Sequence, residues 1–326
     1  MTLCPYCNSD NPKIITTVVD IFKDTYHLTE CLSCNILFIS PQPTDEQLEK
    51  AYSEDYYGAG SEEKFNDSII VKAINFFSKQ RARRLLSHIK KSDATILDWG
   101  CGNGRFLENI NKLNTKTDLI GIEINKKTVE RSSARLGNKA KIYHTNNPAN
   151  LLPHSTCDAI ACIHVFEHIP NPKNTIACFS SLLREGGVLM LVIPNISSWQ
   201  AKIFDKNWFH LDIPRHIHFF PPKILIRELE KNGFKLISTR TFDTEQNPYG
   251  ALQSTLNKIL KKRNVLYEAL KGNKTYADNY FPFAVFLMKL FWLASLPFFI
   301  ITDAFASLFK KGATVELIFK KSLINS

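Results

Sequence analysis

Four cysteines near the amino terminus stand in two identical C-x2-C pairs, Cys4 with Cys7 and Cys31 with Cys34. Two residues between thiolates let both sulfurs turn inward from one tight loop, and two such loops supply the four ligands of a tetrahedral Zn²⁺ site. The segment between the pairs contains two short strand patterns, which is typical of a zinc ribbon. A zinc site with four cysteine ligands has no open ligand position, so we expect the zinc to be structural. Two chance pairs or a redox motif are the alternatives.

A glycine-rich turn follows a short apolar strand pattern in the sequence Leu97-Asp98-Trp99-Gly100-Cys101-Gly102-Asn103-Gly104. Glycines let the backbone turn sharply and approach a ligand closely, and a helical pattern begins directly after Gly104. A second strand pattern then ends in Glu123, whose carboxylate can accept hydrogen bonds from both hydroxyls of a ribose. Together the two patterns predict a nucleoside-binding site.

A dinucleotide dehydrogenase has the same order of elements, but its fingerprint is G-x-G-x-x-G. Counted from Gly100, the position of the third glycine holds Arg105. Asp98 lies two residues before the first glycine, where it suits a cationic amino-acid group better than a pyrophosphate. The turn resembles motif I of the class I S-adenosylmethionine-dependent methyltransferases. This resemblance implies a cofactor site made of Asp98, Gly100, Cys101, Gly102, Gly104, Glu123, Asn146 and His164.

The same resemblance covers residues 94–243 well, and it implies the fold. We expect an α/β Rossmann-like sheet of seven strands, mostly parallel, with the last strand antiparallel, because apolar strand patterns alternate with helical ones. Similar methyltransferases often carry an acidic residue after the third strand, near the adenine amino group. This chain has Asn146 there, so recognition of adenine by the backbone is the alternative.

The acceptor side is predicted from the segment after the fourth strand, Ile163-His164-Val165-Phe166-Glu167-His168-Ile169-Pro170-Asn171-Pro172. It resembles the E-H-I-x-x-P segment of small-molecule methyltransferases, which implies that His164, Glu167 and His168 lie near the transferred methyl group. A neutral imidazole can remove a hydroxyl proton near pH 7, and His168 is the first candidate for that base. A structural histidine in the loop is the alternative. No Asp/Asn-Pro-Pro-aromatic motif for nucleobase amines is present, which disfavours DNA modification.

A second polar cluster lies between Trp208 and Phe220 and contains three histidines, one aspartate and one arginine. Related methyltransferases carry a similar stretch over the active site. We therefore expect Arg215 and His216 on the substrate side, with His216 as a further catalytic candidate and His218 packed. The spacing matches no established metal motif.

About seventy residues separate two strand patterns that should be neighbours, 233–238 and 314–320, far more than an ordinary hairpin loop holds. Residues 251–274 are basic and residues 281–309 strongly apolar. The apolar run is interrupted by Lys289 and Pro297, so we expect two half-length helices meeting near Pro297. Interfacial membrane contact is favoured over a buried cap or dimer face, and a true span is the least favoured.

The chain is predicted to divide into a zinc-ribbon-like segment (1–43), a helical lid or linker (44–92), a methyltransferase core (93–246 and 313–326) and a basic and apolar helical insertion (247–312). The formal net charge of +10 over 326 residues favours an anionic partner. No secretory pattern follows Met1, so the eight cysteines are expected as thiols or metal ligands and the protein as cytoplasmic, peripheral at the inner face of the membrane.

The predicted function is S-adenosylmethionine-dependent methylation of a small molecule, a sugar or a lipid-linked glycan intermediate. Zinc ribbons before this core are also found in methyltransferases of nucleotide-linked deoxysugars, which supports a sugar. A quinone-type O-methyltransferase is the nearest alternative. A non-catalytic zinc-containing scaffold is the alternative from another class, and the intact Asp98, glycines and Glu123 weigh against it. No nucleic-acid partner is expected, since the basic runs border an apolar insertion.

Overall fold

The computed structural model describes residues 3–52, 69–271 and 282–322. Residues 53–68 of the predicted lid lie outside this set. The chain forms two compact units, which are described separately. The ribbon–helix unit comprises Met1–Ser68, Pro194–Ile224 and Arg240–Val315. The sheet unit comprises Ile69–Ile193, Leu225–Thr239 and Glu316–Ser326. The four ranges predicted from the sequence stay a prediction.

Seven strands form a sheet in the order β10-β11-β8-β7-β4-β5-β6, which confirms the predicted fold class. β4 pairs in parallel with β5 on one side and with β7 on the other, so the strand order reverses there. Ligands of such sheets bind beyond the carboxyl ends of the strands at this switch point. The strands are β4 (Thr95–Trp99), β5 (Asp118–Glu123), β6 (Lys141–His144), β7 (Cys157–Ile163), β8 (Leu183–Pro194), β10 (Phe234–Arg240) and β11 (Thr314–Lys321).

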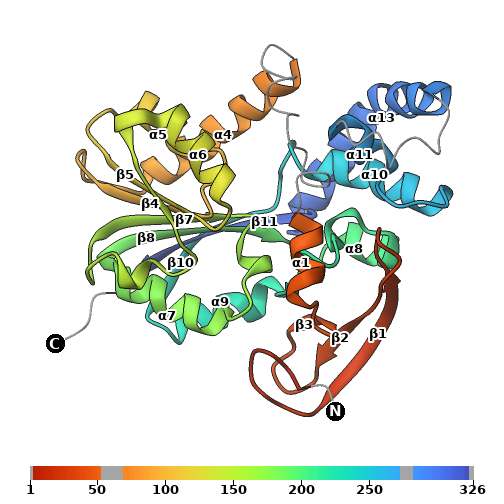
Figure 1. Ribbon diagram of the computed structural model, residues 1–326, viewed down its shortest axis with the longest axis horizontal. Helices are drawn as coiled ribbons and strands as arrows, with labels where there is room; N and C mark the ends of the chain where they lie inside the picture. Colours follow the sequence, from red (N-terminus) through yellow and green to blue (C-terminus); the bar gives the residue numbers. More distant parts are fainter. Residues whose placement is uncertain (1–2, 53–68, 272–281, 323–326) are drawn as a thin grey trace. The chain divides into compact units, whose positions relative to one another are not determined.

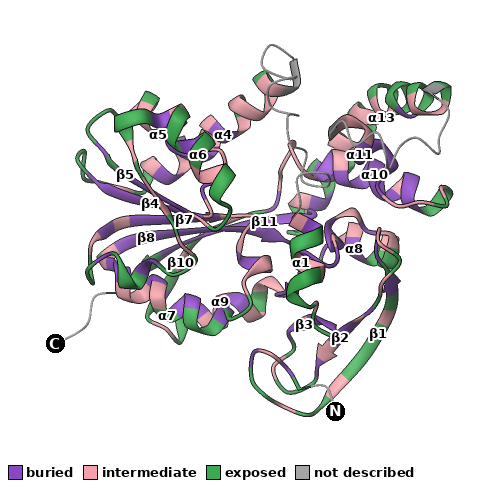
Figure 2. Cartoon of the chain, viewed as in Figure 1, coloured by how far each residue is buried: buried purple, intermediate pink, exposed green. Residues whose placement is uncertain are grey.

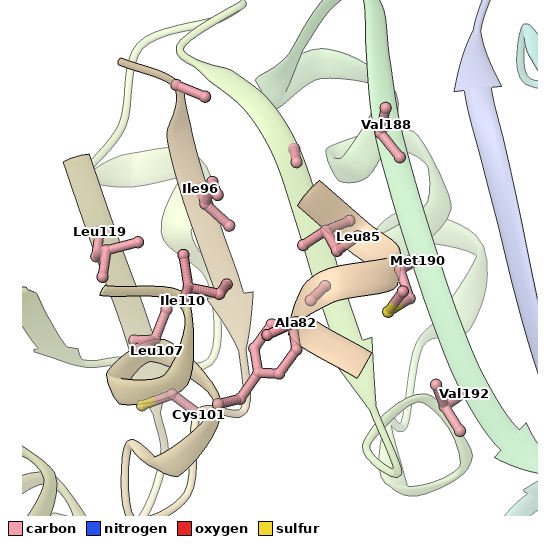
Figure 3. Packing of buried hydrophobic residues seen from close by; sticks show 14 of the residues in the cluster. Ala82, Leu85, Ile96, Cys101, Leu107, Ile110, Leu119, Val188, Met190 and Val192 are labelled. Atoms are coloured by element: carbon pink, nitrogen blue, oxygen red, sulfur yellow. The ribbon is translucent and has the colours of Figure 1, made fainter. Parts of the chain in front are cut away.

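The apolar runs of the sequence become buried strands because helices cover both faces of the sheet. All five residues of β4 are buried. On one face, Ile96 and Met190 of the sheet pack with Leu85 and Leu107 of the helices (Figure 3). α4, α5 and α6 lie on one face and α7 and α9 on the other (Figure 1). Their bounds are α4 (Ile69–Ser87), α5 (Arg105–Leu113), α6 (Lys126–Leu136), α7 (Pro172–Leu182) and α9 (Pro222–Glu230).

Four strands form the sheet of the ribbon–helix unit, in the order β1-β2-β3-β9. β9 comes from the polar cluster after Trp208 and pairs antiparallel with β3, so that Leu37 faces Phe219 and Phe38 faces His218. Trp208 and Phe219 are buried in the same apolar cluster as Tyr26 and Ile39 of the ribbon. The elements are β1 (Pro12–Val19), β2 (Thr25–Cys31), β3 (Leu37–Ser40), β9 (His218–Phe219), α1 (Asp45–Tyr52) and α8 (Trp199–Phe204).

The insertion is helical, as predicted, but the predicted break at Pro297 is wrong. α10 (Asn247–Ile259) and α11 (Val265–Lys271) precede one continuous helix, α13 (Pro282–Leu308), with Pro297 inside it. A proline removes one helix hydrogen bond. Trp292 before the proline and Phe299 after it both pack on the apolar cluster of α10 and α11. This packing on both sides of Pro297 keeps the helix continuous.

Asn247 joins three parts of the ribbon–helix unit. Its side-chain amide donates to the Thr241 carbonyl (2.9 Å) and to Asp303 Oδ1 of α13 (2.7 Å), and its own Oδ1 accepts from Thr314 Oγ1 (2.9 Å). Burial raises the pKa of Asp303 to about 7, although the bond from Asn247 opposes the shift. The one acidic side chain of α13 is therefore part of a buried polar network.

Candidate cofactor site and metal centre

The three glycines of the turn after β4 have different roles. All three have positive φ, which L-residues with side chains rarely adopt. A Cβ on Gly100 would lie 2.4 Å from Val165 Cγ2, and one on Gly104 would lie 2.7 Å from Leu136 Cδ1, so close packing excludes larger residues at both positions. A Cβ on Gly102 would meet nothing within 4 Å. Gly102 therefore opens onto free space in which a ligand can lie against the backbone.

Glu123 ends β5 beside this turn and is held by backbone amides. Its Oε2 accepts from the Gly102 N–H (3.1 Å), and its Oε1 accepts from the N–H groups of Ile124 (2.8 Å) and Asn125 (3.0 Å). Two carboxylate oxygens offer about four acceptor positions, so at least one stays open on Oε2. The carboxylate is fixed in place and can still accept from a sugar hydroxyl.

Asp98 is the penultimate residue of β4 and is 3% exposed. Burial, and after it the charge of Glu123, raises the pKa of Asp98 to about 7. The pKa of the buried Cys162 thiol is also raised, by burial and then by the charges of Glu167 and Asp98. Asp98 and Glu123 therefore act on each other, and Asp98 and Glu167 both act on Cys162. This concentration of negative potential suits a cation and opposes a pyrophosphate, which disfavours a dinucleotide.

His164, Glu167 and His168 lie together directly after β7, as predicted. The His164 backbone is in the left-handed region (φ 54°), and its N–H donates to the Val192 carbonyl (2.8 Å). Its Nδ1 is 3.7 Å from Glu167 Oε1, and its buried Nε2 has no hydrogen-bond partner in the described part of the chain. Backbone strain and an unpaired buried nitrogen cluster at functional sites. Glu167 is buried and His168 half-buried in the 3₁₀ turn Phe166–His168.

The adenine end of the predicted site is more exposed. Asn146 lies in the loop after β6 with an exposed side chain. Ile124, directly after Glu123, is 61% exposed, and its carbonyl bonds the ring Nε2 of His144 (2.8 Å). Ile124 is therefore a further candidate for the adenine end, which a search for polar partners of adenine does not consider. An apolar residue directly after the strand-ending carboxylate was the signal that could have found it.

Arg215 and His216 come together in the ribbon–helix unit, apart in the chain from the histidines after β7. The Arg215 guanidinium donates to Asp212 Oδ1 (2.7 Å), and His216 Nδ1 bonds the His210 carbonyl (2.8 Å). His216 Nε2 lies 3.8 Å from Asp212 Oδ2. Arg215 and His216 are buried, as is His218, which was expected to be packed. Asp212 therefore positions both substrate-side candidates.

The four amino-terminal cysteines converge. Cys4 Sγ lies 3.7 Å from Cys34 Sγ and Cys7 Sγ 3.5 Å from Cys31 Sγ, and all four sulfurs are within 4.8 Å of one another. A tetrahedral site with Zn–S bonds of about 2.3 Å requires sulfurs about 3.8 Å apart. The four thiols therefore fit a Zn²⁺ ion.

The two cysteine loops have the same backbone geometry. The N–H of Asn8 donates to the Cys4 carbonyl (2.9 Å), and the N–H of Asn35 donates to the Cys31 carbonyl (2.7 Å). Both asparagines follow the second cysteine of a pair and have left-handed backbones, with φ 59° and 61°. His27, which lies on β2 between the two pairs, bonds Thr17 Oγ1 through Nδ1 (3.0 Å).

Comparison with known families decides the class. The family model described as "Methyltransferase domain" matches residues 72–239, more than half of the chain. The chain belongs to this family. It is a class I S-adenosylmethionine-dependent methyltransferase, as its motif and sheet had predicted.

Curated relatives of this methyltransferase match about half of its length. The ubiquinone biosynthesis O-methyltransferase of Xanthomonas axonopodis pv. citri is 25% identical over 51% of this chain and 72% of its own. The enzyme of the same name from Colwellia psychrerythraea is 28% identical over 44% of this chain and 62% of its own. Among solved structures, geranyl diphosphate C-methyltransferase from Streptomyces coelicolor is 10% identical with a TM-score of 0.49, covering 78% of this chain and 82% of its own.

The open space at Gly102 gives the first test of the cofactor site. Gly102→Ala places a methyl group where the cofactor should lie, and we expect at least a tenfold loss of S-adenosylmethionine affinity by calorimetry. Gly137→Ala is the matched control, because Gly137 also has a left-handed backbone (φ 54°) with nothing near its Cβ. Strain should lower the stability of both variants by about 1–2 kcal/mol. Equal affinities of the two variants would contradict the assignment.

The carboxylate of Asp98 predicts a pH dependence of binding. Its pKa of about 7 means that the carboxyl protonates as the pH falls, and the attraction for a cationic ligand is then lost. The affinity for S-adenosylmethionine should fall about fivefold from pH 7 to pH 6, a window below the α-amino pKa of the ligand. Asp98→Asn should bind more weakly and lose most of this slope. A wild-type affinity that is constant across the window contradicts the prediction.

Proposed function

We propose that this methyltransferase transfers the methyl group of S-adenosylmethionine to a hydroxyl of a sugar or of a lipid-linked glycan intermediate. The observation that carries the reaction is the edge of the sheet where Asp98 and Glu123 lie close together and Gly102 opens onto free space. A cationic cofactor lying against the backbone at Gly102 would satisfy both carboxylates.

The cofactor would lie along the ends of β4 and β5. Asp98 faces the positive charge of the amino-acid part, and Glu123 accepts from the ribose hydroxyls. Gly100, Cys101, Gly102 and Gly104 form the turn against which the amino-acid part lies. The exposed Ile124 offers an apolar surface to the base, beside the loop of Asn146.

The reaction is an in-line displacement. An oxygen lone pair of the acceptor attacks the methyl carbon, the bond from carbon to sulfur breaks, and its electron pair stays on sulfur as S-adenosylhomocysteine forms. Alignment of acceptor and sulfonium supplies much of the rate. The hydroxyl proton passes to a histidine, for which His168 is the first candidate and His164 and His216 the others. Glu167 can orient His164 across their 3.7 Å separation, and Arg215 and His216 are the substrate-side candidates.

Two features support a lipid-linked acceptor. The net charge of +10 suits an anionic substrate such as a phosphate-linked glycan, and the exposed apolar residues of α13 suit a membrane surface, with contact through residues 251–311. Quinone-type O-methylation is the second candidate. It is favoured by the names of the curated relatives and by the same apolar helix.

We also propose that the thiols of Cys4, Cys7, Cys31 and Cys34 hold structural Zn²⁺. All four positions of the tetrahedron are filled by protein ligands, so the ion joins the two loops and takes no part in methyl transfer.

Labelled methyl transfer tests the acceptor. Purified enzyme with trideuteromethyl S-adenosylmethionine and a lipid extract should yield products heavier by 17 mass units, the mass of CD3 in place of hydrogen, among lipid-linked glycans or sugars. Label confined to quinones would establish the second candidate and reject the first. Absence of label in every small-molecule fraction, with cofactor binding intact, would reject both.

The same assay tests the base. His168→Gln should lower kcat by about 10²–10⁴-fold while leaving the affinity for S-adenosylmethionine unchanged. His154→Gln is the control, because this exposed histidine precedes β7 and bonds Ser181 Oγ (2.7 Å), whereas His168 follows the other end of that strand. An unchanged kcat in His168→Gln would exclude His168 as the base.

The zinc proposal is tested by metal content. Wild-type protein should contain one zinc per chain by mass spectrometry, and Cys31→Ser should lose it together with several degrees of melting temperature. Cys178→Ser is the matched control, because Cys178 is a partly exposed thiol on α7 outside the cluster. A full zinc content in Cys31→Ser, or none in the wild type, would reject the site.

A further inference from the structure

α13 is the one helix of the described residues that is long and apolar enough to cross a membrane, by length and composition. Residues Phe283–Leu308 have a mean hydropathy of 2.1, yet only 6% of the most apolar window is buried. A core helix of this composition would be mostly buried. The helix therefore presents most of its apolar surface to its surroundings, as its colouring in Figure 2 shows.

One stripe of α13 packs on α10 and α11, and Phe305 near the carboxyl end also contacts Trp199 of α8 (ring centroids 5.8 Å). Ala284, Met288, Trp292 and Phe299 pack against the apolar residues of α10 and α11. Their spacing places them on one side of the helix. Near the carboxyl end, Asp303 on the same side is bonded to Asn247 of α10. α13 is thus held along most of its length by helices of its own unit.

The remaining surface of α13 is apolar and exposed. Ten large side chains between its ends have relative exposures from 39% to 79%: Phe283, Phe286, Leu287, Leu290, Phe291, Leu293, Phe298, Ile301, Phe305 and Leu308. We call them the outer face. Lys289 is the one exposed charged residue of the helix. Apolar patches of this extent on soluble monomers mark contact sites.

The charged residues of the insertion favour an anionic membrane over a second copy of the protein as the partner of the outer face. In the described parts of the insertion, 247–271 and 282–312, both carboxylates, Glu268 and Asp303, are buried. Lys261, Lys289 and Lys310 are exposed. A second copy of this surface would bring cations against cations, whereas an anionic bilayer supplies both hydrocarbon and negative head groups.

A membrane-spanning arrangement conflicts with the attachment of α13. A spanning helix needs lipid or protein without exposed charge beside it over about 30 Å. α10 packs beside α13 and carries an exposed lysine, Lys258, with Lys261 shortly after its end. Insertion of α13 across the bilayer would carry these ammonium groups into hydrocarbon or break the contacts with α10. The helix can instead lie in the plane of the surface, with its outer face in the lipid.

We infer that α13 is an in-plane membrane anchor whose outer face inserts into the interface of an anionic leaflet while its inner stripe stays on α10 and α11. This deepens the membrane contact proposed above and rests on it, but it does not depend on which acceptor is methylated. Head groups contact the lysines, and the aromatic and aliphatic side chains contact the upper acyl chains.

Flotation with preformed vesicles tests the inference. Full-length protein should float with vesicles of phosphatidylcholine and phosphatidylglycerol, and at least tenfold less with phosphatidylcholine alone. The outer-face variant (Phe286→Ser, Leu290→Ser, Leu293→Ser, Ile301→Ser) should lose at least ~100-fold in partitioning. A charge variant (Lys261→Gln, Lys289→Gln, Lys310→Gln) should lose the preference for the anionic lipid.

A matched control substitutes exposed apolar residues elsewhere, Ile14→Ser, Ile15→Ser and Ile237→Ser, and should float as the wild type does. Calorimetry with S-adenosylmethionine and zinc content verify that each variant is folded. No flotation, with a dimer that the outer-face variant dissociates, overturns the inference in favour of a second copy. Membrane association that resists pH 11 carbonate and is absent with preformed vesicles overturns it in favour of a span. Loss of flotation with unchanged methyl transfer to a dissolved acceptor leaves the proposed reaction standing.

Discussion

The buried carboxylate of Asp98 is the constraint on which the proposed cofactor site depends. A charge enclosed at the end of β4 is unfavourable unless a cation neutralises it, and its pKa of about 7 reflects this cost. Glu123 adds to the cost by repulsion, since it is fixed nearby by three backbone amides. The fold therefore maintains two neighbouring carboxylates whose repulsion a cation would relieve, and the cofactor proposed for this site supplies such a cation.

The parallel register of the sheet brings these groups to one edge. Asp98 on β4 lies beside Gly121 of β5 on one side and Ala161 of β7 on the other, so β4, β5 and β7 all end near the same level. Glu123 and His164 follow within three residues of those partners. Side chains distant in the sequence thus meet because the strands end together, and the glycine turn leaves the space between them open.

Local chemistry explains what could be predicted from the sequence. The cysteine pairs and the motif around Gly102 each depend on short-range geometry. Their spacing was therefore sufficient to predict that each pair forms a tight loop and that a glycine turn follows a buried strand. β9 could not be predicted, because a two-residue strand that joins β3 from far along the chain has no local pattern. The continuity of α13 through Pro297 depends on packing against α10, which a local rule about proline omits. Arg215 and His216 were recognised as a pair, but their dependence on Asp212 is visible only in the structure.

The insertion lies between two strands that are neighbours in the sheet, and this position explains how the fold accommodates it. β10 and β11 are neighbours in the sheet, so the chain leaves and returns at adjacent points whatever lies between them. The entropy of closing such a loop rises only slowly with its length, and the added residues supply their own apolar cluster and the polar network around Asn247. The strands that carry Asp98, Glu123 and His164 need no change to accommodate it. The insertion is thus separate from the strand ends that carry the proposed cofactor residues, which is consistent with the proposal that α13 holds the enzyme at a surface and takes no part in methyl transfer.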